Sequence, residues 1–218
     1  MTHTLAAVLA LFAVSGLTGV VASLTDRRLL LLVAKPLTTA LLFAVVGPPQ
    51  SSFAWLIDLG IAFSLAGDVA LLLPAKNAFL AGLAIFLGAH IAYIAAFLGV
   101  AGRDALCLPV SLAAAVMAIV TALLLRRLWP HTAGMRAPLV VYGAALATMV
   151  TTAVAAVVAP AVSLAPAAAL GAALFYVGDA SLAVDKFDHR IRFAPVLTLG
   201  VYWLGQLGIA LAARFAPL

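Results

Sequence analysis

The stretch LAGDVALLLPAKNAFLAGLAIFLGAHIAYIAAF, residues 65–97, is apolar almost throughout, yet it holds the carboxylate of Asp68 and the imidazole of His90. The short turn PAKN divides it into the end of one apolar run and the whole of the next. An apolar run of about 20 residues is long enough to cross a bilayer as a helix. The stretch therefore predicts two consecutive membrane-spanning helices, each with an ionisable side chain where a charge is costly.

The composition of the whole chain indicates the same class of protein. Of its 218 residues, 67% are apolar and 9% are charged, and the mean hydropathy is +1.25, whereas soluble domains are about 25% charged. We therefore expect an integral membrane protein. The sequence pI of about 9.9 does not indicate nucleic-acid binding, because the basic residues are scattered over short loops and form no basic stripe. Cys107 is the only cysteine, which excludes a disulfide framework and a cysteine-based metal cluster.

Apolar runs separated by Gly, Pro and charged residues predict eight helices. The first run is interpreted as a span and not as a signal peptide, because the residues MTHT before it carry no positive charge. The predicted fold is an all-α integral membrane protein, a bundle of about eight transmembrane helices in a single domain over residues 1–218. The predicted spans are residues 5–23, 29–46, 53–73, 78–99, 106–125, 137–158, 165–184 and 193–213.

Positive charge is distributed unevenly among the connections. The odd-numbered connections carry nine Lys or Arg residues, whereas the other connections and the termini carry two. Because basic loops tend to stay in the cytoplasm, we expect the odd-numbered connections there. We expect a multi-pass protein of a bacterial inner membrane with both termini periplasmic. The nine residues are Arg27, Arg28, Lys76, Arg126, Arg127, Arg136, Lys186, Arg190 and Arg192, and the two are Arg103 and Arg214.

Three ionisable residues on separate helices are predicted to share one depth. Asp68 and Asp179 lie about five residues, or roughly 8 Å, from the cytoplasmic ends of their helices, and Lys35 lies roughly 9 Å from the same side. A charge left in lipid costs about 2.5 kcal/mol or more, so such residues usually face the bundle interior and mark function. The alternative interpretation is a structural Lys–Asp pair that orients helices.

Polar side chains on five helices favour a pocket around these charges. Thr38 and Thr39 follow Lys35 by three and four residues, Ser64 precedes Asp68 by four, and Tyr176 precedes Asp179 by three. On the other two helices His90 and Tyr93 are three apart, and Tyr202 and Gln206 are four apart, so the members of each set can share a helix face. Any one of them could be an ordinary interhelical hydrogen bond. Together they predict a site whose substrate-binding residues are Lys35, His90, Tyr93, Tyr176, Tyr202 and Gln206.

A short repeat links the two aspartates. The pattern Gly-Asp-x-x-Leu occurs at residues 67–71 and again at residues 178–182, which are 111 positions later. The pattern suggests a weak parallel duplication of four plus four helices, in which Asp68 and Asp179 are equivalent partners. Two carboxyl groups in different environments can divide into a general acid and a general base.

Five segments of the chain resemble the YhhN family of multi-spanning membrane proteins, which includes lysoplasmalogenases. They are AKPLTT (34–39), FSLAGDVALLL (63–73), FLAGLAIFLGAHIAYIAAF (79–97), GAALFYVGDASLAVDKF (171–187) and YWLGQLGIA (202–210). The resemblance implies hydrolysis of the 1-alkenyl ether of a lysoplasmalogen to a fatty aldehyde and a glycerophospho-ethanolamine or glycerophosphocholine. One departure is Gly178, where many relatives have Ser; the change loses a hydroxyl and keeps the carboxylate.

Asp68 and Asp179 suit vinyl-ether hydrolysis as an acid/base pair, because that reaction needs a proton on the alkenyl carbon and then a water molecule. Lys35 could bind the lipid phosphate or bias one aspartate towards its ionised form. We expect no cofactor and no metal, since His90 has no second histidine near it. The expected partners are a lysolipid substrate and membrane lipids, and the oligomeric state stays open. The alternatives are a small-molecule or proton-coupled transporter, a hydrolase of a different lysolipid, and a lipid-binding protein without catalysis.

Overall fold

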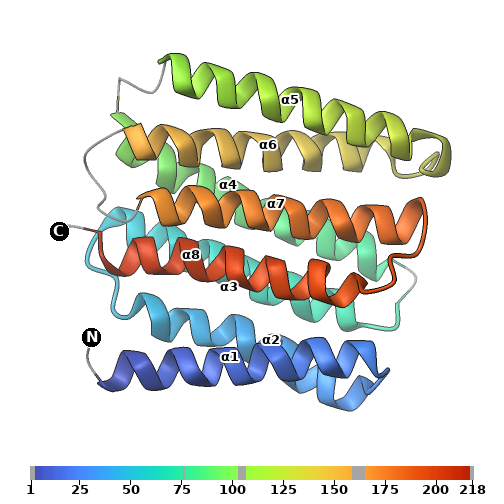
Figure 1. The fold of residues 1–218 in the computed structure, drawn as a ribbon, viewed down its shortest axis with the longest axis horizontal. Coiled ribbons are helices and arrows are strands. Elements are labelled where there is room, and N and C mark those ends of the chain that lie inside the picture. Colours follow the sequence, from blue (N-terminus) through green and yellow to red (C-terminus); the bar gives the residue numbers. More distant parts are fainter. Residues whose placement is uncertain (1–2, 76, 103–106, 159–164, 217–218) are drawn as a thin grey trace.

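The computed structural model of the protein describes residues 3–75, 77–102, 107–158 and 165–216, and in these ranges all the regular elements are helices (Figure 1). Eight helical segments of the described ranges, the last of them Val196–Arg214, are long and apolar enough to cross a membrane, which confirms the predicted fold class. The predicted ends match to within three residues where they fall on described residues; the predicted start of the fifth helix, at 106, lies outside them. The elements are α1 (His3–Leu24), α2 (Arg28–Val46), α3 (Ser52–Leu72), α4 (Ala78–Ala101), α5 (Leu108–Leu128), η2 (Trp129–His131), α6 (Arg136–Val158), α7 (Ala165–Phe187), η3 (Val196–Val201) and α8 (Tyr202–Arg214).

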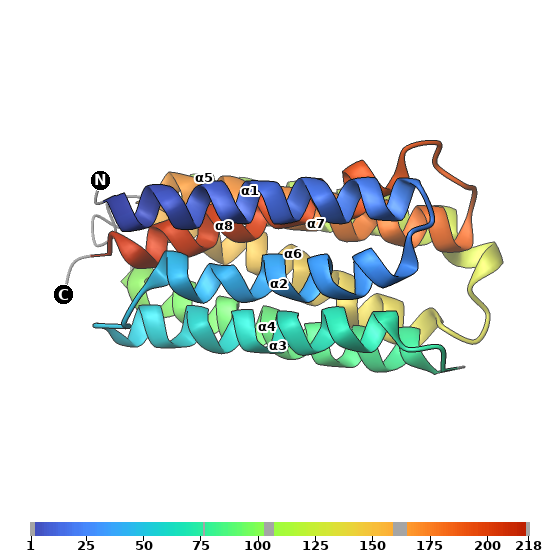
Figure 2. The same ribbon diagram turned by 90° about the horizontal axis from the view of Figure 1, so that it is seen from below.

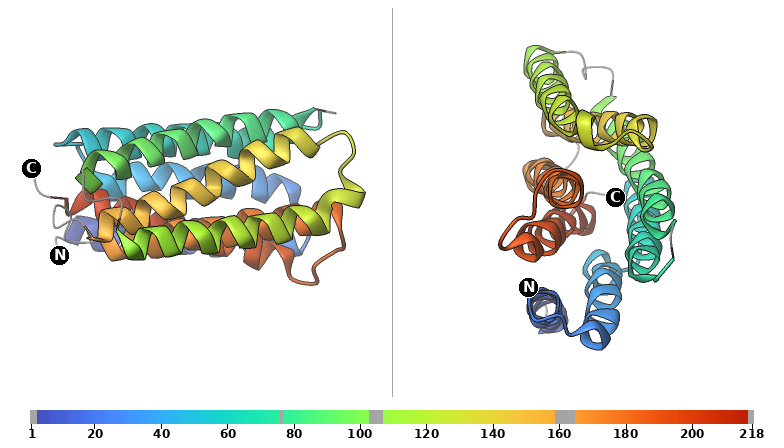
Figure 3. Two further views of the ribbon diagram at one scale, coloured as in Figure 1. Left: turned by 90° about the horizontal axis from the view of Figure 1, so that it is seen from above. Right: turned by 90° about the vertical axis from the view of Figure 1, so that its right-hand side faces the viewer.

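The helices run up and down along one long axis, and both ends of the chain lie at the same end of the bundle (Figures 1 and 2). Sequential pairs pack closely: α1 with α2, α3 with α4, α5 with α6 and α7 with α8. Viewed from the end, α3, α4, α7 and α8 are flanked by α1 and α2 on one side and by α5 and α6 on the other (Figure 3). Further contacts join α4 to α6 and α2 to α8. The centre of the bundle is therefore built by helices from both halves of the chain.

Close contact between α7 and α8 depends on residues without side chains. A Cβ atom at Gly205 would lie 2.6 Å from the carbonyl oxygen of Gly171, and one at Gly208 would lie 2.6 Å from the carbonyl oxygen of Ala167. Small residues of this kind let the backbones of membrane helices approach each other. Gly178 acts in the same way nearer the other end, where a Cβ atom would lie 3.1 to 3.3 Å from atoms of Tyr202. These glycines fix the position of α8, and with it the position of Tyr202.

The α7 helix is longer than the sequence predicts. It runs to Phe187 and not to residue 184, because its last turn packs on α4: the Phe187 ring meets Phe79 edge-on at 5.6 Å, and Lys186 Nζ lies 4.4 Å from the centre of the Phe79 ring. Asp179 is therefore eight residues, or about 12 Å, from the end of its helix. Asp68 is four residues, or about 6 Å, from the end of α3.

The basic residues gather at one end of the bundle. The odd-numbered connections all lie at the right-hand end in Figure 1, and the termini lie at the other end. At the opposite end, the described part of the chain has one Lys or Arg residue, Arg214 at the end of α8. Arg214 donates a hydrogen bond to the Val45 carbonyl oxygen at 3.0 Å. Lys76 and Arg103 lie outside the described residues. The uneven charge thus corresponds to two physical ends of the molecule, while the compartment that each end faces stays a prediction.

Candidate active site

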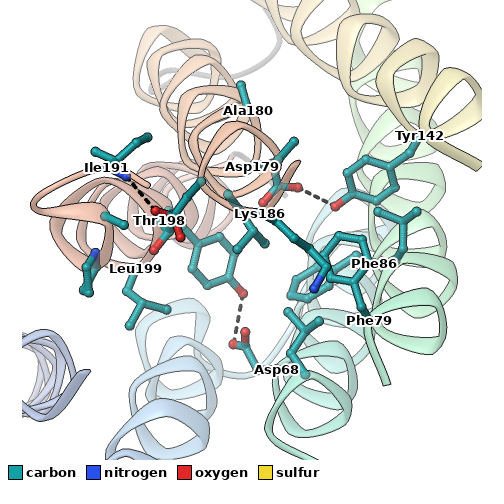
Figure 4. A pocket seen from close by; sticks show the side chains of 18 of the residues that line it. Asp68, Phe79, Phe86, Tyr142, Asp179, Ala180, Lys186, Ile191, Thr198 and Leu199 are labelled. Atoms are coloured by element: carbon teal, nitrogen blue, oxygen red, sulfur yellow. Dashed lines mark hydrogen bonds between the residues drawn. The ribbon is translucent and has the colours of Figure 1, made fainter. Parts of the chain in front are cut away.

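A cavity of about 900 Å³ opens at the end of the bundle that carries the odd-numbered connections. Its mouth is lined by loop residues that include Asp26, Ala75 and Arg190. Asp68 from α3 and Asp179 from α7 both line its interior, as Figure 4 shows. The two aspartates that the sequence singles out therefore face one space.

Asp68 is fully buried and has several hydrogen-bonding partners from two other helices. Lys35 Nζ lies 3.2 Å from Oδ1, while Thr39 and Tyr202 donate their hydroxyl protons to Oδ2 at 2.6 and 3.2 Å. Trp203 Nε1 donates to the Thr39 hydroxyl at 3.1 Å and so holds it in place. Of the two roles that the sequence leaves open for Lys35, the structure shows the pairing with an aspartate, which is Asp68. A negative charge on this carboxylate is matched by an ammonium and by two hydroxyl donors.

Asp179 has a different environment. The Tyr142 hydroxyl of α6 donates to its Oδ2 atom, and His90 Nε2 of α4 lies 3.9 Å from that same oxygen. His90 Nδ1 is 2.5 Å from the carbonyl oxygen of Phe86 and donates to it, so Nε2 is the ring nitrogen that faces Asp179. Among the described residues no Lys or Arg lies within ion-pair distance of Asp179, and Nε2 of His90 has no hydrogen-bond partner.

The partners of the two aspartates come from equivalent places in the two halves of the chain. The second helix of each half supplies a partner to the aspartate on the third, Lys35 to Asp68 and Tyr142 to Asp179. The fourth helix of each half reaches the aspartate of the other half: Tyr202 contacts Asp68, and His90 faces Asp179. This crossed pattern is what a parallel duplication produces, so it favours the repeat, which stays a prediction.

Three of the predicted substrate-binding residues lie behind the cavity wall. Gln206 accepts a hydrogen bond from the Tyr93 hydroxyl at 2.6 Å and donates to Ser64 and Tyr202 at 2.8 and 3.3 Å. Ser64 therefore bonds to Gln206, although its spacing predicts a place beside the carboxylate of α3. His90 also lies outside the cavity lining. All three are fully buried and are positioned to support Tyr202 and Asp179, while their role in substrate binding stays a prediction.

The aromatic ring of Phe175 packs between these buried residues. Its centroid lies 5.0 Å from the His90 ring, 4.9 Å from Tyr202 and 6.4 Å from Tyr93, so it fills the space between α4, α7 and α8. Phe86 adds a second ring, 5.9 Å from Tyr202 and 6.3 Å from Phe175. Of these two rings, Phe86 lines the cavity that holds the two aspartates.

Lys35, Tyr176 and Tyr202 line the cavity, and their role in substrate binding stays a prediction. The Tyr176 hydroxyl, however, pairs with Thr121 of α5 at 2.9 Å and not with Asp179. Tyr142 is a residue of the site that the sequence does not single out. It lies six residues into α6, or about 9 Å from the end of that helix. This is the depth predicted for the aspartates, and that shared depth is the signal that could have identified Tyr142.

The loop after α7 places basic side chains at the mouth. Asp185 accepts hydrogen bonds from Arg190 at 3.2 Å and from the Ile191 backbone at 2.8 Å, which folds the loop back on itself. Asp188 is bonded to His189 and to Arg127 of α5, and these two partners hold the pKa of its carboxyl below the usual value. The basic residues that line the mouth are Lys186, Arg190 and Arg192.

The chain is similar to several named proteins. It is 32% identical over 185 residues to lysoplasmalogenase TMEM86B of Rattus norvegicus, a match that covers 84% of this chain and 72% of that protein. It is 29% identical over 187 residues to lysoplasmalogenase TMEM86B of Mus musculus, with coverages of 86% and 76%. It is 30% identical over 161 residues to lysoplasmalogenase TMEM86A of Homo sapiens, with coverages of 72% and 64%. No solved structure matches it. The YhhN family matches residues 30–213, and the chain belongs to that family.

Proposed function

We propose that this protein is a lysoplasmalogenase, a membrane hydrolase that cleaves the vinyl ether bond of a single-chain 1-alkenyl glycerophospholipid. The products are a fatty aldehyde and glycerophosphoethanolamine or glycerophosphocholine. The observation that carries the proposal is the pair of carboxyl groups facing one cavity within the spanning helices. The similarity to proteins named lysoplasmalogenase supports the choice of bond and substrate.

The surroundings of the two aspartates support a division of roles. Asp68 faces an ammonium and two hydroxyl donors, which suit an ionised carboxylate and therefore a general base. Asp179 has one hydroxyl donor and no ammonium within ion-pair distance in the described structure, which suits a protonated carboxyl and therefore a general acid. The sequence does not distinguish the acid from the base. The unequal partners of the two residues support Asp179 as the acid and Asp68 as the base.

In the proposed reaction Asp179 gives its proton to the second carbon of the alkenyl chain, and the positive charge develops on the first carbon and the ether oxygen. A water molecule adds to the first carbon while Asp68 takes its proton. Asp179 then removes the proton of the hemiacetal hydroxyl, the bond between that carbon and the glycerol oxygen breaks, and Asp68 returns its proton to that oxygen. One water is consumed, and both carboxyl groups regain their starting states.

Lys35 and the basic residues of the mouth have separate roles in this proposal. The Lys35 ammonium lies 3.2 Å from Asp68 and is buried, so it serves as the counter-charge of the base. The head-group phosphate lies at the mouth beside Lys186 and Arg192, for which the described residues show no ion pair with a carboxylate. The mouth faces the cytoplasm and both termini face the periplasm of a bacterial inner membrane, as the distribution of basic residues between the two ends suggests.

The test is turnover by the purified protein. The protein is incubated with 1-alkenyl, 1-alkyl and 1-acyl lysophospholipids, and the products are identified by mass spectrometry. We expect a fatty aldehyde from the 1-alkenyl lipids and no product from the 1-alkyl ethers, whose bond cannot form the stabilised cation by protonation at carbon. Hydrolysis of the 1-acyl lipids alone would mean that the same site catalyses a different reaction, the hydrolysis of an ester. Substrate flux across sealed vesicles without any covalent product would replace the enzyme with a transporter.

A further inference from the structure

A second, smaller hollow lies between α4 and α6, next to the main cavity. It has a volume of about 360 Å³ and is formed by the first halves of the two helices, near the end that carries the odd-numbered connections. Its lining is apolar apart from the hydroxyl of one tyrosine: Leu80, Leu83, Ala84, Leu87, Ala137, Pro138, Val141 and Tyr142. Leu80 and Val141 are 42% and 54% exposed, so this α4–α6 groove is open towards the lipid.

The α4–α6 groove adjoins the site. Leu83 and Tyr142 line both the groove and the main cavity. The Tyr142 hydroxyl donates a hydrogen bond to Asp179, which places the inner end of the groove beside this carboxyl group (Figure 4). An apolar groove that is open towards the lipid therefore lies next to the Asp179 side of the cavity, with Leu83 and Tyr142 between the two spaces.

We propose that the α4–α6 groove binds the hydrocarbon chain of the single-chain lipid, which enters and leaves the site through it from the membrane. The inference rests on the proposed function. The other outlet of the cavity is lined by Asp26, Lys186, Arg190 and Arg192, where a hydrocarbon chain would displace water from charged groups. The groove keeps the chain in apolar surroundings while the head group stays at the charged mouth.

This arrangement sets the position of the bond that reacts. With the chain in the groove and the phosphate at the mouth, the first two carbons of the chain lie where the groove joins the cavity, at Leu83 and Tyr142. The carbon that must receive a proton is then next to Asp179, the proposed acid. The groove therefore explains why the acid is the aspartate on α7 and not Asp68.

A bulky residue in the groove tests the proposal. Ala84→Trp fills the groove from α4, and Ala137→Trp fills it from α6, at two exposed positions away from the aspartates. We expect each variant to lower kcat/KM for a long-chain 1-alkenyl lysolipid at least tenfold, and to change it less than twofold for an analogue with a four-carbon alkenyl chain. Ala95→Trp is the matched control, because it lies on nearly the same face of α4, is exposed and is about 16 Å farther along the helix.

Unchanged long-chain turnover in both folded groove variants would overturn the proposal, and so would an equal loss for the two chain lengths. A second measurement does not depend on turnover. A 1-alkyl lysolipid with a photoreactive diazirine in the middle of its chain is cross-linked to the wild-type protein, and the modified peptides are mapped. We expect modification of residues 80–87 and 137–142. Cross-links at these residues without turnover of any alkenyl lipid would contradict the proposed function but support the groove as the binding site of the chain. Turnover with cross-links elsewhere would support the proposed function but contradict the groove.

Discussion

At the residue scale, Asp68 and Asp179 should act as one unit. Asn has nearly the shape of Asp but can neither give nor take the required proton, so Asp68→Asn and Asp179→Asn should each lower turnover of the alkenyl substrate by about 10² to 10⁴. The double variant should be little slower than the slower single variant, because effects within a catalytic set are not additive. Steady-state kinetics on folded protein measure this, and the pH–rate profile of the wild type should show two limbs.

Near-normal turnover in either folded single variant would remove that aspartate from the chemistry. A double variant whose loss equals the product of the two single losses would mean that the residues act independently. Ser64→Ala is a useful control, because this hydroxyl contacts Gln206 and neither aspartate.

Lys35 should matter for folding as well as for turnover. Lys35→Met leaves the fully buried Asp68 without its ammonium partner, and breaking a buried pair in this way costs about 3 to 5 kcal/mol. We therefore expect a lower unfolding temperature in detergent together with reduced activity. Lys35→Arg should restore only part of both, because the guanidinium group is larger and forked. Wild-type stability and activity of Lys35→Met would show that the pair is dispensable.

The Tyr142 hydroxyl should contribute to turnover through Asp179. Tyr142→Phe removes one hydrogen bond and keeps the ring, and a hydrogen bond of about 1 kcal/mol corresponds to about a fivefold change in rate. Tyr176→Phe is the comparison, because it removes a hydroxyl that contacts Thr121 and neither aspartate. We expect kcat to fall in the first variant and to stay close to wild type in the second. Equal values of kcat for the two variants would contradict a role of Tyr142 at the acid.

Only part of the site can be predicted from the sequence at this scale. Asp68, Asp179 and Lys35 can be predicted because a charge inside an apolar run is costly and needs a partner. Tyr142 is overlooked because a lone tyrosine in an apolar helix has no such cost. Phe175 gives no signal at all, since its role depends on three neighbouring rings that come together only in the folded bundle.

At the element scale, the packing of α8 on α7 should control the site. Gly205→Ala would place a methyl group 2.6 Å from the Gly171 carbonyl oxygen and 2.7 Å from the Phe175 nitrogen, both backbone atoms that cannot turn away. We expect a destabilisation of about 1 to 3 kcal/mol and a loss of turnover, because α8 carries Tyr202 to Asp68. Thermal unfolding and kinetics measure the two effects.

The control for this change is another glycine in a spanning helix. A Cβ atom at Gly99 of α4 meets no atom within 4 Å, so Gly99→Ala should keep full turnover and can raise stability by up to about 1 kcal/mol through helix propensity. Equal behaviour of Gly99→Ala and Gly205→Ala would mean that the close approach of α7 and α8 does not matter.

The existence of the helices is the best-predicted feature, because bilayer thickness fixes their length and apolar composition marks them. Their irregular ends are harder to predict. The end of α7 depends on the stacking of Phe187 and Lys186 on Phe79, which is a contact with another helix. The π-helical segment Val196–Val201 before α8 has no sequence pattern that separates it from ordinary helix.

At the scale of the whole molecule, the two halves of the chain complete each other. Each aspartate takes one partner from its own half and another from the other half, so neither four-helix half holds a finished site. The cavity consequently lies between the halves and opens beside the basic loops. Which side of the membrane that end faces then decides from where the polar head group arrives.

The last prediction concerns this orientation. In a background in which Cys107, the only cysteine, is replaced by Ala, a single cysteine is placed by Gly134→Cys in the connection before α6 or by Gln50→Cys in the connection before α3. Both positions are exposed and bear no charge. Because the odd-numbered connections carry the excess of Lys and Arg, a membrane-impermeant thiol reagent should label the cysteine at 50 in intact cells and the one at 134 only after permeabilisation. The opposite labelling would place the cavity mouth outside the cytoplasm, and labelling of both in intact cells would show a mixed orientation.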